Sequence, residues 1–186
     1  MGRITELLDT AHGRSQAHSW LIAGALLPHE AYELLQLAPG AQLIDVRSQA
    51  ELELNGAIPG AVHVEWQSWP GWVLNPHFLA QLAQATDPES LLLFICRSGP
   101  RSHRAAVACT EAGRGSCYNV LEGFEGDLNK TTGRLSHLRK VARLWLRRPR
   151  VSVQASRTVF EAAAEWPGPA CCPWCVDGAE SSVGPA

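Results

Sequence analysis

The chain lacks a hydrophobic run long enough to cross a membrane. Its longest apolar stretch near the start, residues 20–27, is far shorter than the ~20 residues that a transmembrane helix needs. No basic flank or small-residue cleavage site frames this stretch, so it does not have the pattern of a secretory signal peptide. We therefore expect a cytoplasmic protein.

A regular cysteine framework and an internal repeat are also missing. The six cysteines are irregularly spaced, and Cys109 and Cys117 stand among apolar residues, where a reduced thiol packs as a small hydrophobic group. Without a repeat of fixed period, the chain does not have the pattern of a solenoid. With 46% hydrophobic and 18% charged residues among 186, the composition is that of a globular protein with one domain plus an appendage.

Charges of one sign are missing from two long segments near the C-terminus. Residues 128–160 carry nine Lys or Arg and no Asp or Glu, and residues 161–186 carry four acidic residues and no basic ones. Residues before Trp20 show no periodicity that would bury one face of a helix or strand. These changes of character divide the chain into an irregular leader over 1–19, a domain over 20–135, and an atypical, loose tail over 136–186.

Strand-like and helix-like segments alternate inside the domain. Helix-forming stretches follow Pro28, Ser48 and Asn75, and another lies over 102–112; each is followed by a turn that contains Gly or Pro. Strands separated by segments of helical length predict an α/β fold, with a parallel sheet covered by helices on both faces. The strand-like runs are 42–46, 61–64, 91–95 and 117–121.

Cys96 directly follows the most apolar of these runs and precedes a loop of small residues and arginines that opens into the next helix. In open parallel sheets, ligands bind beyond the carboxyl ends of the strands. Free N–H groups at a helix start and nearby guanidinium groups stabilise negative charge, so we expect the Cys96 thiol to ionise easily and to act as a nucleophile. The predicted binding loop consists of Arg97, Ser98, Gly99, Pro100, Arg101 and Ser102.

Three segments of the chain resemble signatures of one enzyme family. Residues 96–102 resemble the active-site loop of rhodaneses, which are sulfurtransferases. Residues 43–47, followed by Glu51 and by 56–61, resemble an upstream signature of that family, although an alanine stands where a histidine is common. Residues 118–124 resemble the strand and glycine turn that follow the catalytic helix. The likeness covers about residues 20–130.

The resemblance implies a rhodanese-like fold, in which helices flank both faces of a five-stranded parallel sheet, and a single-domain sulfurtransferase. Cys96 would take sulfane sulfur from thiosulfate or a related small anionic donor and pass it to cyanide, a thiol or a protein acceptor. No cofactor or metal, and neither nucleic acid nor membrane, is expected to take part. Arg97 and Arg101 would either bind the donor or position the loop through carboxylates. Asp45 and Arg47 are expected to support the site as an internal ion pair.

Two other functions stay open at this point. Cysteine phosphatases and arsenate reductases use a similar loop, but theirs has one more residue between cysteine and arginine than the four that separate Cys96 from Arg101. The shorter loop favours a ring that fits one sulfur atom. A noncatalytic sulfur carrier would use the same cysteine to accept a persulfide from a partner protein and hand it on.

The C-terminal segment departs from the family pattern. The glycine-tryptophan segment and the Gly-Leu-Pro-Trp ending of relatives are missing, and a frameshifted end is one hypothesis for this. Cys172 and Cys175 have the spacing of a redox pair or of half a zinc site, but we expect a loose tail, because eleven residues follow and zinc needs four ligands. The basic stretch is expected to be a solvated face.

Elsewhere in the chain, an indole-rich loop is expected to pack rather than to bind substrate. Its indoles are Trp66, Trp69 and Trp72.

Overall fold

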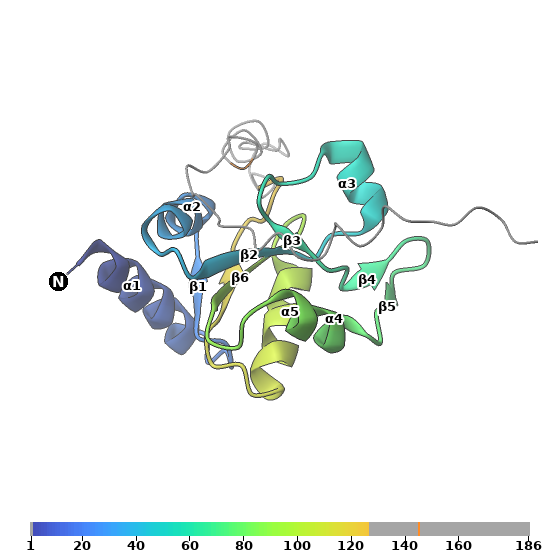
Figure 1. Ribbon diagram of the computed structural model, residues 1–186. Helices are drawn as coiled ribbons and strands as arrows, with labels where there is room; N and C mark the ends of the chain where they lie inside the picture. Colours follow the sequence, from blue (N-terminus) through green and yellow to red (C-terminus); the bar gives the residue numbers. More distant parts are fainter. Residues whose placement is uncertain (1, 127–144, 146–186) are drawn as a thin grey trace, which may run out of the picture. The chain divides into compact units, whose positions relative to one another are not determined.

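The computed structural model describes residues 2–126 and Trp145. Its main sheet has five parallel strands in the spatial order β1-β7-β6-β2-β3 (Figure 1). This confirms the predicted α/β fold. The strands are β1 Gly24–Leu26, β2 Ala41–Asp45, β3 Val62–His63, β6 Leu91–Ile95 and β7 Cys117–Val120.

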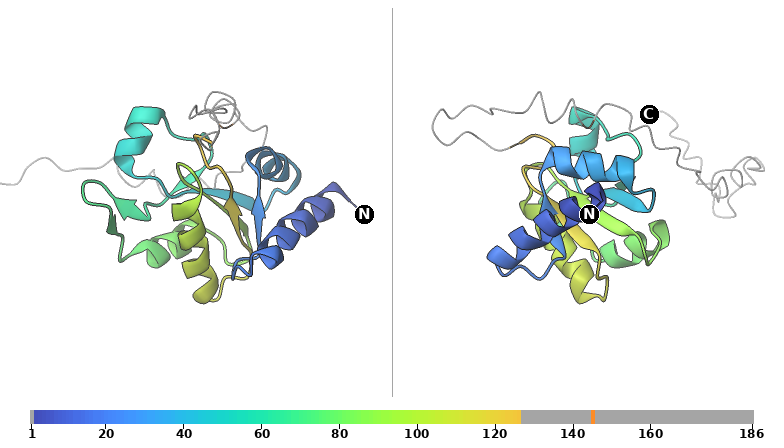
Figure 2. Two further views of the ribbon diagram at one scale, coloured as in Figure 1. Left: turned by 180° about the vertical axis from the view of Figure 1, so that it is seen from behind. Right: turned by 90° about the vertical axis from the view of Figure 1, so that its left-hand side faces the viewer.

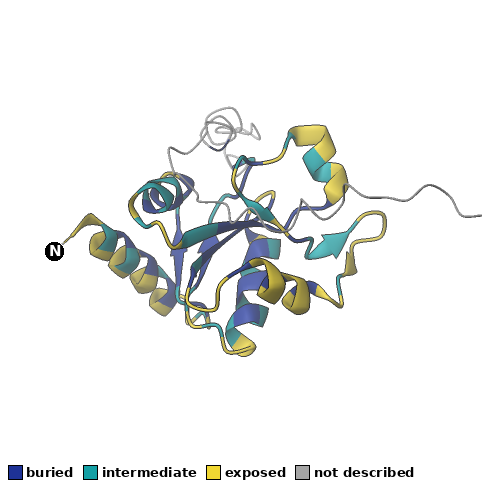
Figure 3. Ribbon diagram, viewed as in Figure 1, coloured by how far each residue is buried: buried dark blue, intermediate teal, exposed yellow. Residues whose placement is uncertain are grey.

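Helices cover both faces of the sheet, as predicted (Figure 1 and Figure 2). Alternate strand residues point to opposite faces, so one apolar cluster forms under α1 and α2 and a second under α4 and α5. Figure 3 shows that most of the central strands are buried, whereas α1 and α3 are largely exposed on their outer sides. The helices are α1 Arg3–Ala17, α2 Pro28–Leu37, α3 Gln49–Asn55, α4 Phe78–Ala85 and α5 Pro100–Glu111.

Sequence signals located several helix starts correctly. Pro28 occupies the first turn of α2, where its missing N–H costs no hydrogen bond. Ser48 caps α3: its side chain accepts from the Glu51 N–H, while the Glu51 carboxylate accepts from the Ser48 N–H at 2.9 Å. Pro28 and Ser48 thus mark where the chain turns away from the carboxyl ends of β1 and β2. Among the described helices, none is long and apolar enough to cross a membrane.

The predicted irregular leader over 1–19 is wrong, because α1 occupies most of it. Leu7, Ala11 and Ser15 recur every four residues and form the buried face of this helix. Ile4 and Leu8 pack against the same apolar cluster, so the helix does carry apolar residues at the i, i+3, i+4, i+7 spacing from Ile4 to Ala11. Two ion pairs tie the helix to α2: Arg3 with Glu33 at 2.7 Å, and Arg14 with Glu30 at 2.6 Å.

Strand β1 and a small hairpin were not predicted as elements. The three residues of β1 are fully buried and pair with β7 at the edge of the sheet. The indole-rich loop contains a two-stranded antiparallel hairpin, formed by β4 Gln67–Ser68 and β5 Val73–Leu74. Both elements are too short for a periodic signal to separate them from a loop.

The predicted loose tail over 136–186 lies outside the described residues, apart from Trp145. The Trp145 side chain is 2% exposed, and its ring meets that of Tyr32 edge to face at 6.2 Å between centroids. At this one position the chain is packed into the first apolar cluster rather than loose. The Cys172 and Cys175 pair, the frameshift hypothesis and the basic stretch concern residues that are not described.

Gly24 gives a direct test of how closely α1 packs on β1. A Cβ atom at this position would lie 2.8 Å from the Ala11 Cβ and 2.9 Å from Tyr118 Cδ1. We expect Gly24→Ala to lower the free energy of unfolding by about 1–3 kcal/mol, the usual cost of overpacking. Gly13→Ala is the control, because nothing lies within 4 Å of its Cβ and alanine favours a helix interior by ~0.5–1 kcal/mol. The measurement is urea unfolding of wild type and both variants. If Gly24→Ala were as stable as wild type, the close packing of α1 on β1 would be contradicted.

Candidate functional site

Cys96 directly follows β6 at the carboxyl edge of the sheet, and its side chain is 1% exposed. The Cys96 Sγ accepts a hydrogen bond from the Gly99 N–H at 3.1 Å and lies 3.3 Å from the Ser102 hydroxyl oxygen. Gly99 has a φ of +103°, which a side chain would strain, and this conformation turns its N–H toward the sulfur. The thiol therefore has hydrogen-bond donors that would stabilise a negative charge.

The loop from Arg97 to Ser102 winds directly into α5. Gly99 is the residue before the helix, and Pro100 is its first residue. Arg97, Ser98 and Pro100 are exposed, whereas Ser102 is buried behind the sulfur. The macrodipole of a 12-residue helix adds positive potential at this end. The structure thus brings together Cys96 and every residue of the predicted loop.

Both loop arginines are bound to carboxylates. Arg97 Nε lies 2.6 Å from Glu125 Oε2, with the arginine side chain exposed. Arg101 donates two hydrogen bonds to Glu51, at 2.6 and 2.7 Å, and its guanidinium lies 4.9 Å from the ring centroid of Trp72. These contacts are those of the second role left open by the sequence, in which the arginines position the loop through carboxylates.

Charge around Arg101 connects this ion pair to the sulfur. Burial alone would lower the pKa of Arg101, but its hydrogen bonds to Glu51 and the charges of Glu51, Cys96 and Asp45 raise it overall. The positive charge is therefore retained close to Cys96.

Backbone hydrogen bonds from the segment after β7 hold Cys96 in place. The Phe124 N–H donates to the Cys96 carbonyl oxygen, and the Glu125 N–H donates to the Arg97 carbonyl oxygen, both at 2.9 Å. Gly123, with a φ of +59°, makes this approach possible: a Cβ there would lie 2.5 Å from the Cys96 carbonyl oxygen. The glycine turn, by which we mean residues 122–125, is therefore part of the site.

Asp45 and Arg47 form the expected internal ion pair. Both are buried, and Arg47 Nη2 lies 2.6 Å from Asp45 Oδ2. The same nitrogen donates to the Gly56 carbonyl oxygen at 3.0 Å, and the guanidinium lies 4.0 Å from the ring centroid of Phe124. The pair thus joins the end of β2 to the glycine turn that holds Cys96.

The three indoles have different environments. Trp66 is partly buried and packs edge to face on Phe78, as expected. Trp69 and Trp72 are 58% and 43% exposed and contact each other, so the packing prediction is wrong for these two. Through its contact with Arg101, Trp72 lies beside the site.

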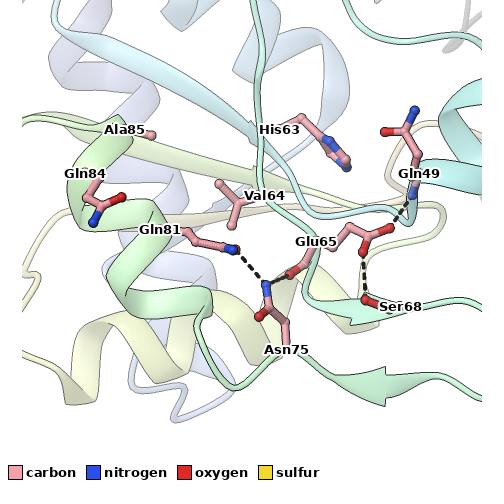
Figure 4. A pocket seen from close by; sticks show the side chains of 9 residues that line it. All are labelled: Gln49, His63, Val64, Glu65, Ser68, Asn75, Gln81, Gln84 and Ala85. Atoms are coloured by element: carbon pink, nitrogen blue, oxygen red, sulfur yellow. Dashed lines mark hydrogen bonds between the residues drawn. The ribbon is translucent and has the colours of Figure 1, made fainter. Parts of the chain in front are cut away.

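A groove of about 650 Å³ lies between the β3 end, the hairpin and α4 (Figure 4). Its Glu65 carboxylate accepts from the Ser68 hydroxyl at 2.7 Å and from the Gln49 N–H. Cys96 does not line this groove. In residues 2–126 and 145, no three His, Cys, Asp or Glu side chains gather to form a metal site.

Sequence reasoning did not single out several residues that shape the site. Glu125 and Asn119 bind Arg97 and Ser102 respectively, and Gly123 touches the Cys96 backbone. The glycine turn stood within a recognised motif, but no sequence signal showed which backbone it would contact. Cys109 and Cys117, predicted to fill the core, are free and fully buried.

Gly123→Ala should disturb the loop that carries Cys96. The added methyl group would collide with backbone atoms and occupy a left-handed conformation, so we expect the free energy of unfolding to fall by at least about 2 kcal/mol. We also expect slower alkylation of Cys96 by iodoacetamide. Gly115→Ala, with nothing within 4 Å of its Cβ, is the control. Equal stability and equal alkylation rates in the two variants would show that the turn does not position the cysteine.

The Arg101–Glu51 pair should make stability depend on acidic pH. Burial alone would raise the pKa of Glu51, but hydrogen bonds from Arg101 and Ser48 lower it overall. Ionised Glu51 therefore stabilises the fold above about pH 4.3, its unfolded pKa, and this contribution is lost as pH falls through the lower folded pKa. Urea unfolding should show wild type more stable than Glu51→Gln near neutrality, with the difference shrinking on acidification. If the difference in the free energy of unfolding between wild type and Glu51→Gln did not change with pH, the pairing would be contradicted. Glu53→Gln, on the same helix, is the control.

Comparison with known proteins adds to this geometry. A family model described as "Rhodanese-like domain" matches residues 27–130. An uncharacterised protein of Rickettsia rickettsii is 34% identical over 100 residues, which cover 53% of this chain and 80% of that protein. Thiosulfate sulfurtransferase GlpE of Pseudomonas syringae is 32% identical over 98 residues, with the same two coverages.

Solved structures show the same kind of similarity. A crystal structure of an M. tuberculosis protein is 39% identical, with a TM-score of 0.49, and the match covers 59% of this chain and 86% of that one. The polysulfide-sulfur transferase homodimer of Wolinella succinogenes is 26% identical, with a TM-score of 0.44, and the match covers 66% and 85% of the two chains.

Proposed function

Because the chain belongs to the rhodanese-like domain family, we propose that it is a sulfurtransferase that carries sulfane sulfur as a persulfide on Cys96. The donor is thiosulfate or a related small anion, and the acceptor is cyanide or a thiol. The observation that carries this proposal is the Gly99 N–H directed at the Cys96 Sγ from 3.1 Å, at the start of α5. Family membership supports sulfurtransferase chemistry in general, and the geometry supports this cysteine as its centre.

The proposed reaction has two steps that balance without an external oxidant or reductant. In the first, the Cys96 thiolate attacks the outer sulfur of thiosulfate; a new S–S bond forms, the S–S bond of the donor breaks, and sulfite leaves with the electron pair. In the second, cyanide or a thiolate attacks the terminal sulfur of the persulfide. Cys96 then leaves as a thiolate, ready for another cycle.

The loop residues have distinct proposed roles in this cycle. The Gly99 N–H and the Ser102 hydroxyl stabilise charge on the sulfur of Cys96. Arg97 is the exposed cation of the loop, so it attracts the anionic donor. Arg101 is held by Glu51, so it keeps a positive charge near the reacting sulfur without having to bind the donor.

Cys96→Ser should abolish sulfur transfer. We expect wild type to gain the mass of one sulfur atom on Cys96 after exposure to thiosulfate, and to lose it on addition of cyanide with formation of thiocyanate. The serine variant should show neither change. Gln84→Ala, in the groove on α4, is the control and should react like wild type.

Other outcomes would overturn this proposal in favour of a named alternative. Hydrolysis of an aryl phosphate without any reaction with thiosulfate would identify a cysteine phosphatase. Loading of Cys96 by a persulfide-bearing protein, but never by thiosulfate, would identify a noncatalytic sulfur carrier.

A further inference from the structure

Asn119 lies behind the reacting sulfur, on the strand next to β6. It belongs to β7, where it pairs in register with Phe94, two residues before Cys96. Its side chain is 3% exposed, and its Oδ1 lies 2.8 Å from the Ser102 hydroxyl oxygen. Asn119 therefore contacts the hydroxyl that in turn contacts the Cys96 Sγ.

Ser102 has fewer protons than acceptors around it. Its hydroxyl oxygen lies 2.8 Å from Asn119 Oδ1, 2.8 Å from the Gly99 carbonyl oxygen and 3.3 Å from the Cys96 Sγ. A serine hydroxyl donates a single hydrogen bond. The Gly99 carbonyl oxygen already accepts from the His103 N–H at 3.0 Å. The Gly99 carbonyl oxygen has a second lone pair, so this oxygen, the Asn119 oxygen and the sulfur all compete for the Ser102 proton.

The side-chain amide of asparagine can act in either sense at this position. Its oxygen accepts and its nitrogen donates, and the two groups have nearly the same size, so a half-turn exchanges them without changing the packing. With the oxygen toward Ser102, Asn119 takes the serine proton. With the nitrogen toward Ser102, Asn119 donates to the hydroxyl oxygen and leaves the proton for the sulfur.

We propose that Asn119 is a positioning residue that turns its NH2 group toward Ser102 when Cys96 is negatively charged, so that the Ser102 hydroxyl donates to the sulfur. This inference rests on the proposed function only in taking the charged sulfur to be a thiolate or a persulfide. A buried negative charge gains more from a donated hydrogen bond than a neutral amide oxygen does. The charge on the sulfur therefore selects the donor orientation of the amide.

The cations around Cys96 leave room for such a contribution. Arg101 of α5 is bound to Glu51 of α3, and Arg97 is bound to Glu125 of the glycine turn. The Asp45–Arg47 pair at the end of β2 is likewise an ion pair. Each cation shares its charge with a carboxylate partner, so a neutral donor that contacts the sulfur directly, such as Ser102, adds to what Arg101 supplies.

The test measures the rate of Cys96 alkylation by iodoacetamide as a function of pH. The variants are Ser102→Ala, Asn119→Leu and the double variant. We expect Ser102→Ala to slow alkylation near neutral pH by about tenfold and to move the pH midpoint upward, because a hydrogen bond to a charged group is lost. We expect Asn119→Leu to slow it by about threefold, because the hydroxyl loses the donor that orients it.

The sign of the Asn119→Leu effect is the sharpest outcome. If the amide oxygen held the Ser102 proton throughout, leucine would release that proton to the sulfur and alkylation would become faster, which would overturn the proposal. In the Ser102→Ala background, the leucine substitution should change the rate by less than about twofold, because the two residues act through one hydrogen bond. Additive effects would overturn the proposal as well.

A second measurement covers the case in which Asn119→Leu does not fold, as judged by circular dichroism. NMR of the wild-type protein follows hydrogen exchange of the Asn119 NH2 group. Protection that is lost in Ser102→Ala supports the donor orientation, and equal exchange in the two proteins overturns it. Alkylation needs no sulfur donor, so failure to react with thiosulfate would refute the proposed function while leaving this test intact.

Discussion

The whole site depends on two backbone hydrogen bonds that fix the carbonyl groups of Cys96 and Arg97. They come from the N–H groups of Phe124 and Glu125, so the segment after β7 holds the segment after β6. With those carbonyls fixed, the chain can turn through Gly99 and direct its N–H at the sulfur. The sulfur's position is therefore set by main-chain contacts, which side-chain exchange on the surface does not alter.

Three ion pairs surround this contact and connect it to different elements. Arg97 binds the glycine turn, Arg101 binds α3, and Arg47 binds Asp45 at the end of β2. A buried ion pair contributes little net stability, because desolvation offsets the attraction between the charges. Breaking one leaves an unpaired buried charge, which is costly. The Arg47–Asp45 and Arg101–Glu51 pairs are thus better understood as fixing geometry than as adding stability, and the exposed Arg97–Glu125 pair also adds little stability.

Sequence patterns predicted the central fold well because its segments are distinct. The five apolar residues of β6 and the Gly and Pro residues after each helix left few alternatives for the parallel sheet. The loop from Cys96 to Ser102 was found for the same reason, since its residues are contiguous. Helix α1 was missed although its apolar residues from Ile4 to Ala11 recur at helical spacing, because this pattern is short and ends at the buried but polar Ser15.

What the sequence could not predict was contact between distant segments. Glu51 and Arg101 are separated by 50 residues and Arg97 and Glu125 by 28, and nothing local indicates that these charges pair. Asn119 was visible as part of a strand, but the meeting of its amide with Ser102 follows only from the register of β7 beside β6. Pairing partners become known only once the sheet order is known.

The pairing of β1 with β7 joins the first and last strands of the part of the chain that the structure describes: Gly24 lies opposite Tyr118. During synthesis, β1 therefore emerges from the ribosome long before its neighbour exists. Bringing strands together over such a separation costs loop-closure entropy, and a fold with many contacts between distant residues folds more slowly. Until β7 has been made, the backbone edge of β1 lacks the strand with which it pairs in the folded sheet.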